Sequence, residues 1–284
     1  MGLSILLAMA VNVASRRALM PSLGWLAGYG DLLRTLVRRE VRARYKGSAL
    51  GLLWSLVYPL AMMGVYTLVF SVLWKSAGDI VHYPLFVLAG LGVWGFFQAA
   101  VQLGTGSLVA NASLIKKVWF PRELVVTAVV LAQTISIAVI LAVLIPLDLI
   151  VVPRTARTMV LAVPILAALL CLALGFAWIL SIGNVFFRDV EHLLAILFLP
   201  WFFLTPVLYS LDVLPAAVEH EWLIHLLRYG NPVTPYVESL RAVILQGVVP
   251  GATLLVYVFL VGPLLALIGL RVMQRYEDRL AIEL

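Results

Sequence analysis

The hydrophobic positions of this 284-residue chain fall into six long blocks separated by shorter polar segments. The blocks cover roughly residues 52–73, 85–110, 124–147, 159–183, 193–210 and 251–271. A helix of about 20 apolar residues crosses the ~30 Å hydrocarbon core of a bilayer, because each residue adds about 1.5 Å. The pattern therefore predicts an all-α membrane protein with six transmembrane helices. Residues 1–50 are expected to form an N-terminal segment, and residues 51–284 the membrane domain.

Composition excludes a water-soluble fold. The chain is 63% hydrophobic and 12% charged, whereas soluble domains contain about 25% charged residues. A net charge of +6 would indicate nucleic acid in a soluble protein. Here the positive residues cluster at the ends of the spans, which favours anionic lipid headgroups and argues against nucleic acid. The single cysteine, Cys171, lies in an apolar block and is interpreted as a small buried hydrophobic residue.

The distribution of lysine and arginine predicts the orientation. Of the 20 lysines and arginines, fifteen lie before the first span, in the even-numbered loops or after the last span, which all face the same side of the membrane. The other five lie in the loops on the opposite side. By the positive-inside rule, both termini are cytoplasmic and the chain is a multi-pass membrane protein. The apolar stretch 3–11 precedes Arg16 and Arg17, the reverse of a signal peptide, so it is expected to be cytoplasmic or interfacial.

Two further segments are predicted outside the six spans. Residues 31–46 form a basic amphipathic pattern that favours an interfacial helix on phosphate headgroups, although an ordinary positive-inside anchor explains it equally well. Arginines lie on one side of this pattern and apolar residues on the other: Arg34, Arg38 and Arg42 against Leu33, Leu36 and Val37. Residues 211–250 contain two short helical patterns, 216–228 and 235–246, separated by Gly230-Asn231-Pro232. They are expected to form a re-entrant hairpin at the outer face, before the last span.

Large side chains recur at every fourth position of the first span. They are Trp54, Tyr58, Met62, Tyr66, Phe70 and Trp74, and further rings in later spans include Trp94, Phe96, Phe97, Phe176, Trp178, Trp201, Phe202 and Phe203. Aromatic stripes in membrane helices usually serve packing or interfacial anchoring. A stripe through the whole membrane depth can also stack on sugar rings, since their axial C–H bonds face the π surface.

The polar residues of the spans have two possible roles. Gln98, Gln102, Asn111, Gln133, Thr134 and Ser136 either stabilise helix packing by hydrogen bonds or line a path for neutral, hydroxylated cargo. Glycines of the second span, such as Gly90 and Gly104, are expected to let helices or a second copy approach closely.

Enzyme motifs are missing from the sequence. His220 and His225, with Glu221 between them, are five residues apart. The two histidines of a zinc-protease helix are four apart, so no metal site is expected here. There is no phosphate-binding G-x-x-x-x-G-K-[S/T] loop and no ionisable residue at mid-membrane depth, so energy for any transport is expected to come from a partner. The chain itself is therefore not predicted to be an enzyme and needs no cofactor of its own.

Four segments of the sequence resemble segments of the permeases of the type-2 family of polysaccharide-exporting ABC transporters. They are RYKGSALGLLWSLVYPLAMMGVYTLVF (44–70), LIKKVWFPRELV (114–125), FFRDVEHLLAILFLPWFFLTPVLY (186–209) and YGNPVTPYVESLRAVIL (229–245). The ending RYEDRLAIEL is also similar, so the resemblance covers about residues 35–284 in order, while the first thirty residues have no recognised counterpart. Such permeases export O-antigen, capsular or teichoic-acid polymers, usually on a lipid carrier.

The resemblance implies a homodimer with two copies of a separate ATPase subunit, which would bind ATP and Mg. It implies three sets of site residues. The first is an aromatic substrate channel formed by Trp54, Tyr58, Tyr66, Phe70, Trp74, Phe97, Trp201 and Phe202. The second is a lipid-headgroup entry formed by Arg34, Arg38, Arg42, Arg44 and Lys46. The third is an ATPase-coupling surface formed by Lys116, Lys117, Phe120, Pro121, Arg122, Glu123, Arg188 and Asp189.

Two other functions fit part of this pattern. A drug or small-lipid efflux permease of the same superfamily would share the topology and the missing ATP loop, but gives less reason for continuous aromatics and a basic interfacial helix. A membrane scaffold would have no use for an ATPase-docking loop. The sequence therefore predicts an ATP-driven exporter of lipid-linked polysaccharide.

Overall fold

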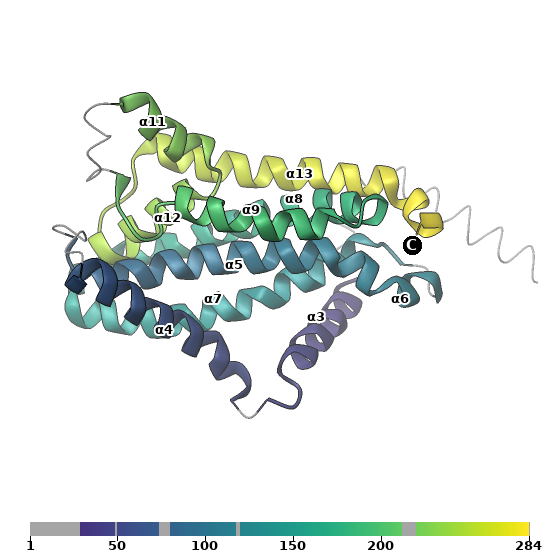
Figure 1. Cartoon of the computed structure of the whole chain (residues 1–284), viewed down its shortest axis with the longest axis horizontal. Helices are drawn as coiled ribbons and strands as arrows, with labels where there is room; N and C mark the ends of the chain where they lie inside the picture. Colours follow the sequence, from purple (N-terminus) through teal and green to yellow (C-terminus); the bar gives the residue numbers. More distant parts are fainter. Residues whose placement is uncertain (1–28, 49, 74–79, 118–119, 212–219, 284) are drawn as a thin grey trace, which may run out of the picture.

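The computed structural model describes residues 29–48, 50–73, 80–117, 120–211 and 220–283, and all regular secondary structure among these residues is helical (Figure 1). The α-helices are α3 (Gly30–Tyr45), α4 (Trp54–Thr67), α5 (Tyr83–Ala110), α6 (Ala112–Lys117), α7 (Glu123–Val151), α8 (Ala162–Phe186), α9 (Val190–Leu204), α11 (Glu221–His225), α12 (Thr234–Arg241) and α13 (Ala252–Glu283). Short 3-10 turns cover Gly51–Leu53, Pro153–Arg157 and Met159–Leu161. Turns of π-helix cover Leu68–Leu73, Leu226–Gly230 and Ala242–Gln246.

Five helical segments are long and apolar enough to cross a membrane. They are Gly51–Leu73, Tyr83–Ala110, Glu123–Val151, Thr155–Phe186 and Ala252–Glu277, and each overlaps a predicted span. The block predicted as a span at 193–210 instead forms the 15-residue helix α9. It ends at Leu204 because Thr205 takes an extended conformation before Pro206, as the ring of a proline disfavours helical geometry in the residue that precedes it.

The core lies between α5, α7, α8 and α13. Helix α5 is the most enclosed of the candidate spans, with 67% of its most apolar stretch buried. Helices α8 and α13 approach until their backbones touch: a Cβ added to Gly175 would lie 2.6 Å from the carbonyl carbon and oxygen of Leu265. Small residues therefore permit close helix packing within one chain, as expected for membrane helices.

Helix α4 lies at the edge of this bundle. Only 6% of the most apolar stretch of its span is buried. Figure 1 shows α3 and α4 forming a V whose arms reach the bundle and whose point, at the connection between them, stands away from it. The hydroxyls of Tyr45 and Ser55 are 2.7 Å apart and link the two arms near that point.

The connections lie at two opposite ends of the bundle. One end carries α6, the turn between α8 and α9, and the C-terminal end of α13, while the other carries α11 and α12 (Figure 1). The hydroxyl of Thr158, between α7 and α8, donates to the carbonyl of Val243 at 2.6 Å, so this connection belongs to the α12 end. The loops that sequence analysis assigned to one side of a membrane thus lie at one end of the molecule.

Candidate functional site

A cavity of about 710 Å³ lies between α4, α5, α7 and α9. Its volume is within the range of roughly 300–1,000 Å³ that is usual for small-molecule sites. Helix α4 supplies one wall, and the buried helices α5 and α7 supply the opposite wall. Arg44, in the last turn of α3, also lines it. The cavity therefore extends from the basic N-terminal segment into the helical bundle.

Aromatic side chains form much of the cavity wall. Trp54, Tyr58 and Tyr66 line it from α4, Trp94 and Phe96 from α5, and Phe198 and Phe202 from α9. The rings of Tyr66 and Phe202 stack at a centroid distance of 6.2 Å and an angle of 30°. Trp94 meets Phe202 edge-to-face at 5.8 Å. Since Trp94 also meets Phe198 at 6.0 Å, the rings of Tyr66, Phe202, Trp94 and Phe198 are connected. Tyr58 leaves 65% of its area exposed.

Four of the predicted channel residues, Trp54, Tyr58, Tyr66 and Phe202, line this cavity. Phe70 contacts Tyr66 at a centroid distance of 6.4 Å but does not line it. Phe70 lies in the π-helical turn Leu68–Leu73, where the wider turn changes the face on which successive side chains appear. Trp74 lies outside the described residues.

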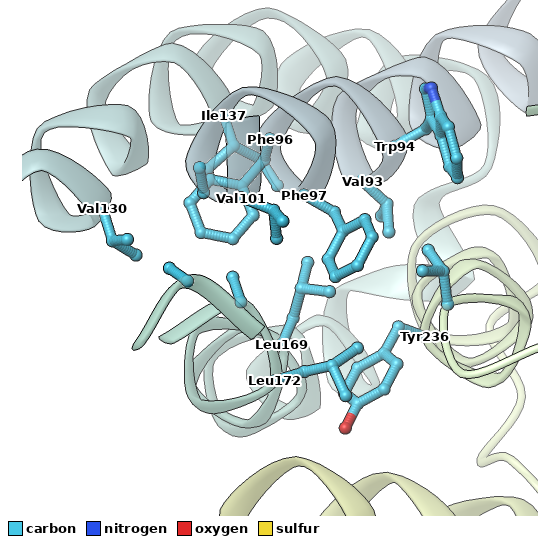
Figure 2. Packing of buried hydrophobic residues seen from close by; sticks show 14 of the residues in the cluster. Val93, Trp94, Phe96, Phe97, Val101, Val130, Ile137, Leu169, Leu172 and Tyr236 are labelled. Carbon is cyan, nitrogen blue, oxygen red and sulfur yellow. The ribbon is translucent and has the colours of Figure 1, made fainter. Parts of the chain in front are cut away.

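The other two predicted channel residues belong to the packing behind the cavity. Phe97 is 0% exposed, and its ring lies between α5 and the side chains of Leu169 and Leu172 on α8 (Figure 2). Trp201 stacks on Phe198 at 5.8 Å and meets Phe97 at 5.4 Å. Both therefore support the lining residues from behind.

Phe198 was not among the predicted channel residues. It precedes Phe202 by four residues, which places both on one face of a helix, and that spacing could have identified it.

The basic helix α3 packs on the bundle through one side. Leu36 is buried, and Leu32, Leu33 and Val37 pack against the core cluster. The predicted entry residues Arg34, Arg38, Arg42, Arg44 and Lys46 are all exposed. Of these, Arg38, Arg42 and Lys46 border a groove of about 930 Å³ together with Arg39.

Helix α3 is also tied to the bundle by a hydrogen bond. The Arg39 guanidinium donates to the side-chain oxygen of Asn111, which follows α5. It also contacts the carboxylate of Glu40 at 2.9 Å. The basic side of α3 therefore keeps a fixed position relative to the α5–α6 junction.

The predicted coupling residues divide into exposed and buried groups. Lys116 and Lys117 on α6, and Arg188 and Asp189 between α8 and α9, are exposed at the same end of the bundle (Figure 1). Phe120, Arg122 and Glu123 are buried, and Pro121 is half-buried. The carbonyl of Glu123 accepts hydrogen bonds from the Thr127 hydroxyl at 2.6 Å and the Trp178 indole at 3.4 Å. The buried residues thus fix the start of α7, and the exposed ones remain accessible to a partner.

A polar cluster that sequence analysis missed holds the turn between α8 and α9 against α5. The side-chain oxygen of Asn184 accepts from the backbone N–H of Glu191 at 3.2 Å, and its amide donates to the carbonyl of Thr105 at 3.4 Å. Gln102 donates to the carbonyl of Glu191 at 3.0 Å. A Cβ added to Gly106 would lie 2.9 Å from the Glu191 carboxylate. The turn is therefore joined to a helix that lines the cavity.

At the other end, Arg241 fastens α12 to the bundle. Its buried guanidinium donates to the carbonyls of Phe86 at 3.1 Å, Pro206 at 2.5 Å and Val207 at 2.6 Å. It also lies 3.4 Å from the centroid of the Phe86 ring. Burial lowers the pKa of the Arg241 guanidinium to about 9, so the group remains charged at neutral pH. A side chain on Gly90 would collide with it.

Asn231 makes a second connection at this end. Its side-chain oxygen accepts from the Trp201 indole at 3.0 Å and from the N–H of Val233 at 3.1 Å, while its amide donates to the Thr205 hydroxyl at 2.9 Å. The turn predicted at Gly230-Asn231-Pro232 is present, and two short helical segments flank it. The turn therefore also fixes the end of α9.

Comparison with known proteins agrees with this architecture. Residues 31–245 match the family described as ABC-2 type transporter. The chain is 32% identical over 224 residues to the O-antigen export system permease protein RfbA of Myxococcus xanthus, and the match covers 79% of this chain and 84% of that protein. It is 28% identical over 252 residues to a protein of the same name from Klebsiella pneumoniae, where the match covers 88% of this chain and 94% of the relative. It is 22% identical over 247 residues to the polysialic acid transport protein KpsM of Escherichia coli, where the match covers 87% of this chain and 93% of the relative. The chain therefore belongs to the ABC-2 type transporter family, as a multi-pass membrane permease.

Proposed function

We propose that this chain is the permease subunit of an ATP-driven exporter that moves a lipid-linked polysaccharide from the cytoplasmic side across the inner or plasma membrane. The observation that carries the proposal is the cavity of connected aromatic rings between α4, α5 and α9. Such rings stack on the apolar faces of sugars. Relatives named for O-antigen export and polysialic acid transport support the same cargo class.

Energy comes from a separate subunit. Two copies of this chain assemble with two copies of an ATPase that binds ATP and Mg. The ATPase docks at the end that carries α6 and the α8–α9 turn, where Lys116, Lys117, Arg188 and Asp189 are exposed. This chain does not carry out the hydrolysis.

Both termini are cytoplasmic, and α9 completes a sixth crossing. Its 15 residues span about 22 Å at 1.5 Å per residue, so the turn residues that follow Leu204 complete the path. The segment from α11 to Gln246 re-enters the outer leaflet, where the Arg241 and Asn231 bonds satisfy backbone groups that lipid cannot. The exposed arginines of α3 border the entry of the lipid headgroup.

Depletion of this protein tests the proposal. We expect lipid-linked glycan to accumulate on the cytoplasmic side and a surface polymer to disappear, as measured by extraction and sizing of glycans. An unchanged glycan profile together with new drug sensitivity would contradict the proposal and identify an efflux permease instead.

A further inference from the structure

A strip of uncharged polar residues runs along the cavity wall opposite α4. Gln98 and Gln102 lie one turn apart on α5, and Gln133 and Ser136 lie one turn apart on α7, and all four line the cavity. These four residues are called the carboxamide strip. Thr134, the neighbour of Gln133, does not line the cavity, and its hydroxyl donates to the carbonyl of Leu131 in its own helix at 2.7 Å. Thr134 thus bonds within its own helix, whereas the four residues of the strip line the cavity.

Two oxygens of the strip are buried and have no hydrogen-bond partner among the described residues. They are Oε1 of Gln102 and Oε1 of Gln133, and Gln133 is only 1% exposed. The amides of both side chains are already used, since Gln102 donates to Glu191 and Gln133 to Val129. Nearly all buried polar atoms in proteins have a partner, so two unpartnered oxygens beside one cavity point to a ligand group that donates to them. The strip therefore presents hydrogen-bond acceptors that a ligand can satisfy.

We infer that the carboxamide strip binds the hydroxyl groups of a neutral sugar residue of the cargo, within a single subunit. The inference rests on the proposed function and adds a specific site to it. Sugar hydroxyls donate to both carboxamide oxygens while the sugar's C–H face lies against the rings of Tyr66, Trp94 and Phe202. An apolar lipid chain has no donor for these oxygens. A diphosphate offers only acceptors, which the oxygens would repel.

Replacement of Gln133 by Met tests the inference, because it removes the acceptor and keeps the shape of the side chain. The assay measures initial export rates in inverted membrane vesicles with ATP, using as cargo the lipid-linked glycan that accumulates on depletion. We expect Gln133→Met to raise the half-saturating glycan concentration about five- to tenfold, the effect of one lost hydrogen bond. Copurification of the ATPase should stay unchanged, which shows that the variant assembles. The matched control Thr134→Val should change the half-saturating concentration by less than about twofold.

Gln102→Met provides a second variant for the case in which Gln133→Met does not assemble, because Gln102 carries the other unpartnered oxygen and also lines the cavity. Unchanged glycan kinetics in an assembled Gln133→Met protein, or in Gln102→Met where Gln133→Met fails, would overturn the inference and leave the proposed function intact. Absence of glycan export by the wild-type complex would instead refute the proposed function, and the inference with it.

Discussion

Single residues at the two ends of the bundle hold its peripheral segments in place. Arg241 is the strongest example, because one guanidinium binds three carbonyls from two other parts of the chain. Sequence analysis counted this residue only as one of the five positive charges on the outer side. A lone arginine between apolar neighbours carries no signal of its partners, since these are backbone carbonyls far away in the sequence.

Replacement of Arg241 by Leu should destabilise the protein by about 3 kcal/mol, because it removes three hydrogen bonds that one buried guanidinium makes. Thermal unfolding in detergent measures the effect. Arg157→Leu is the control, since Arg157 is exposed and exposed substitutions usually change stability by no more than about 0.5 kcal/mol. Equal unfolding temperatures for the two variants would contradict a clamping role for Arg241.

Sequence analysis could not tell which of two adjacent residues on one helix lines the cavity and which packs only in the core. Phe96 lines the cavity, whereas Phe97 lies in the core. Because α5 is apolar on every side, its hydrophobic pattern does not indicate which face meets other helices. By contrast, the prediction that α3 has an exposed basic side agrees with the structure, because charge makes that helix amphipathic.

At the scale of elements, long apolar stretches were predictable and their ends were less so. The spans predicted at 124–147 and 251–271 lie within the observed segments Glu123–Val151 and Ala252–Glu277. An uninterrupted apolar stretch of this length has helix as its main option in lipid. The block at 193–210 was predicted too long, although Pro206 marks the position where helical geometry stops.

The α8–α9 turn leads to a prediction about coupling. Exchange of its charges, Arg188→Glu with Asp189→Lys, should release the ATPase or separate ATP hydrolysis from glycan export, because both side chains are exposed at the proposed docking end. The ratio of glycan exported to ATP hydrolysed in proteoliposomes measures this. Arg157→Glu, at the opposite end, is the control and should keep the wild-type ratio. A wild-type ratio in the exchanged protein would remove this turn from the interface.

At the scale of the whole molecule, the positively charged loops lie at one end of the bundle. This arrangement predicts the side of the membrane from which each exposed residue is accessible. In a Cys171→Ser background, Ser113→Cys on α6 and Glu221→Cys on α11 place one exposed thiol at each end. A membrane-impermeant maleimide should label position 221 in spheroplasts and position 113 only in inverted vesicles. Labelling of both positions from the same side would refute the predicted topology.

The bond between Arg39 and Asn111 has a consequence for the timing of transport. It joins the helix that borders the proposed lipid entry to the start of α6, where the ATPase is proposed to dock. A displacement of α6 by the nucleotide cycle would therefore reach α3 through this bond, in addition to the packing of Leu36 on the core. Admission of cargo would then be coupled to ATP turnover, and each turnover would reset the entrance.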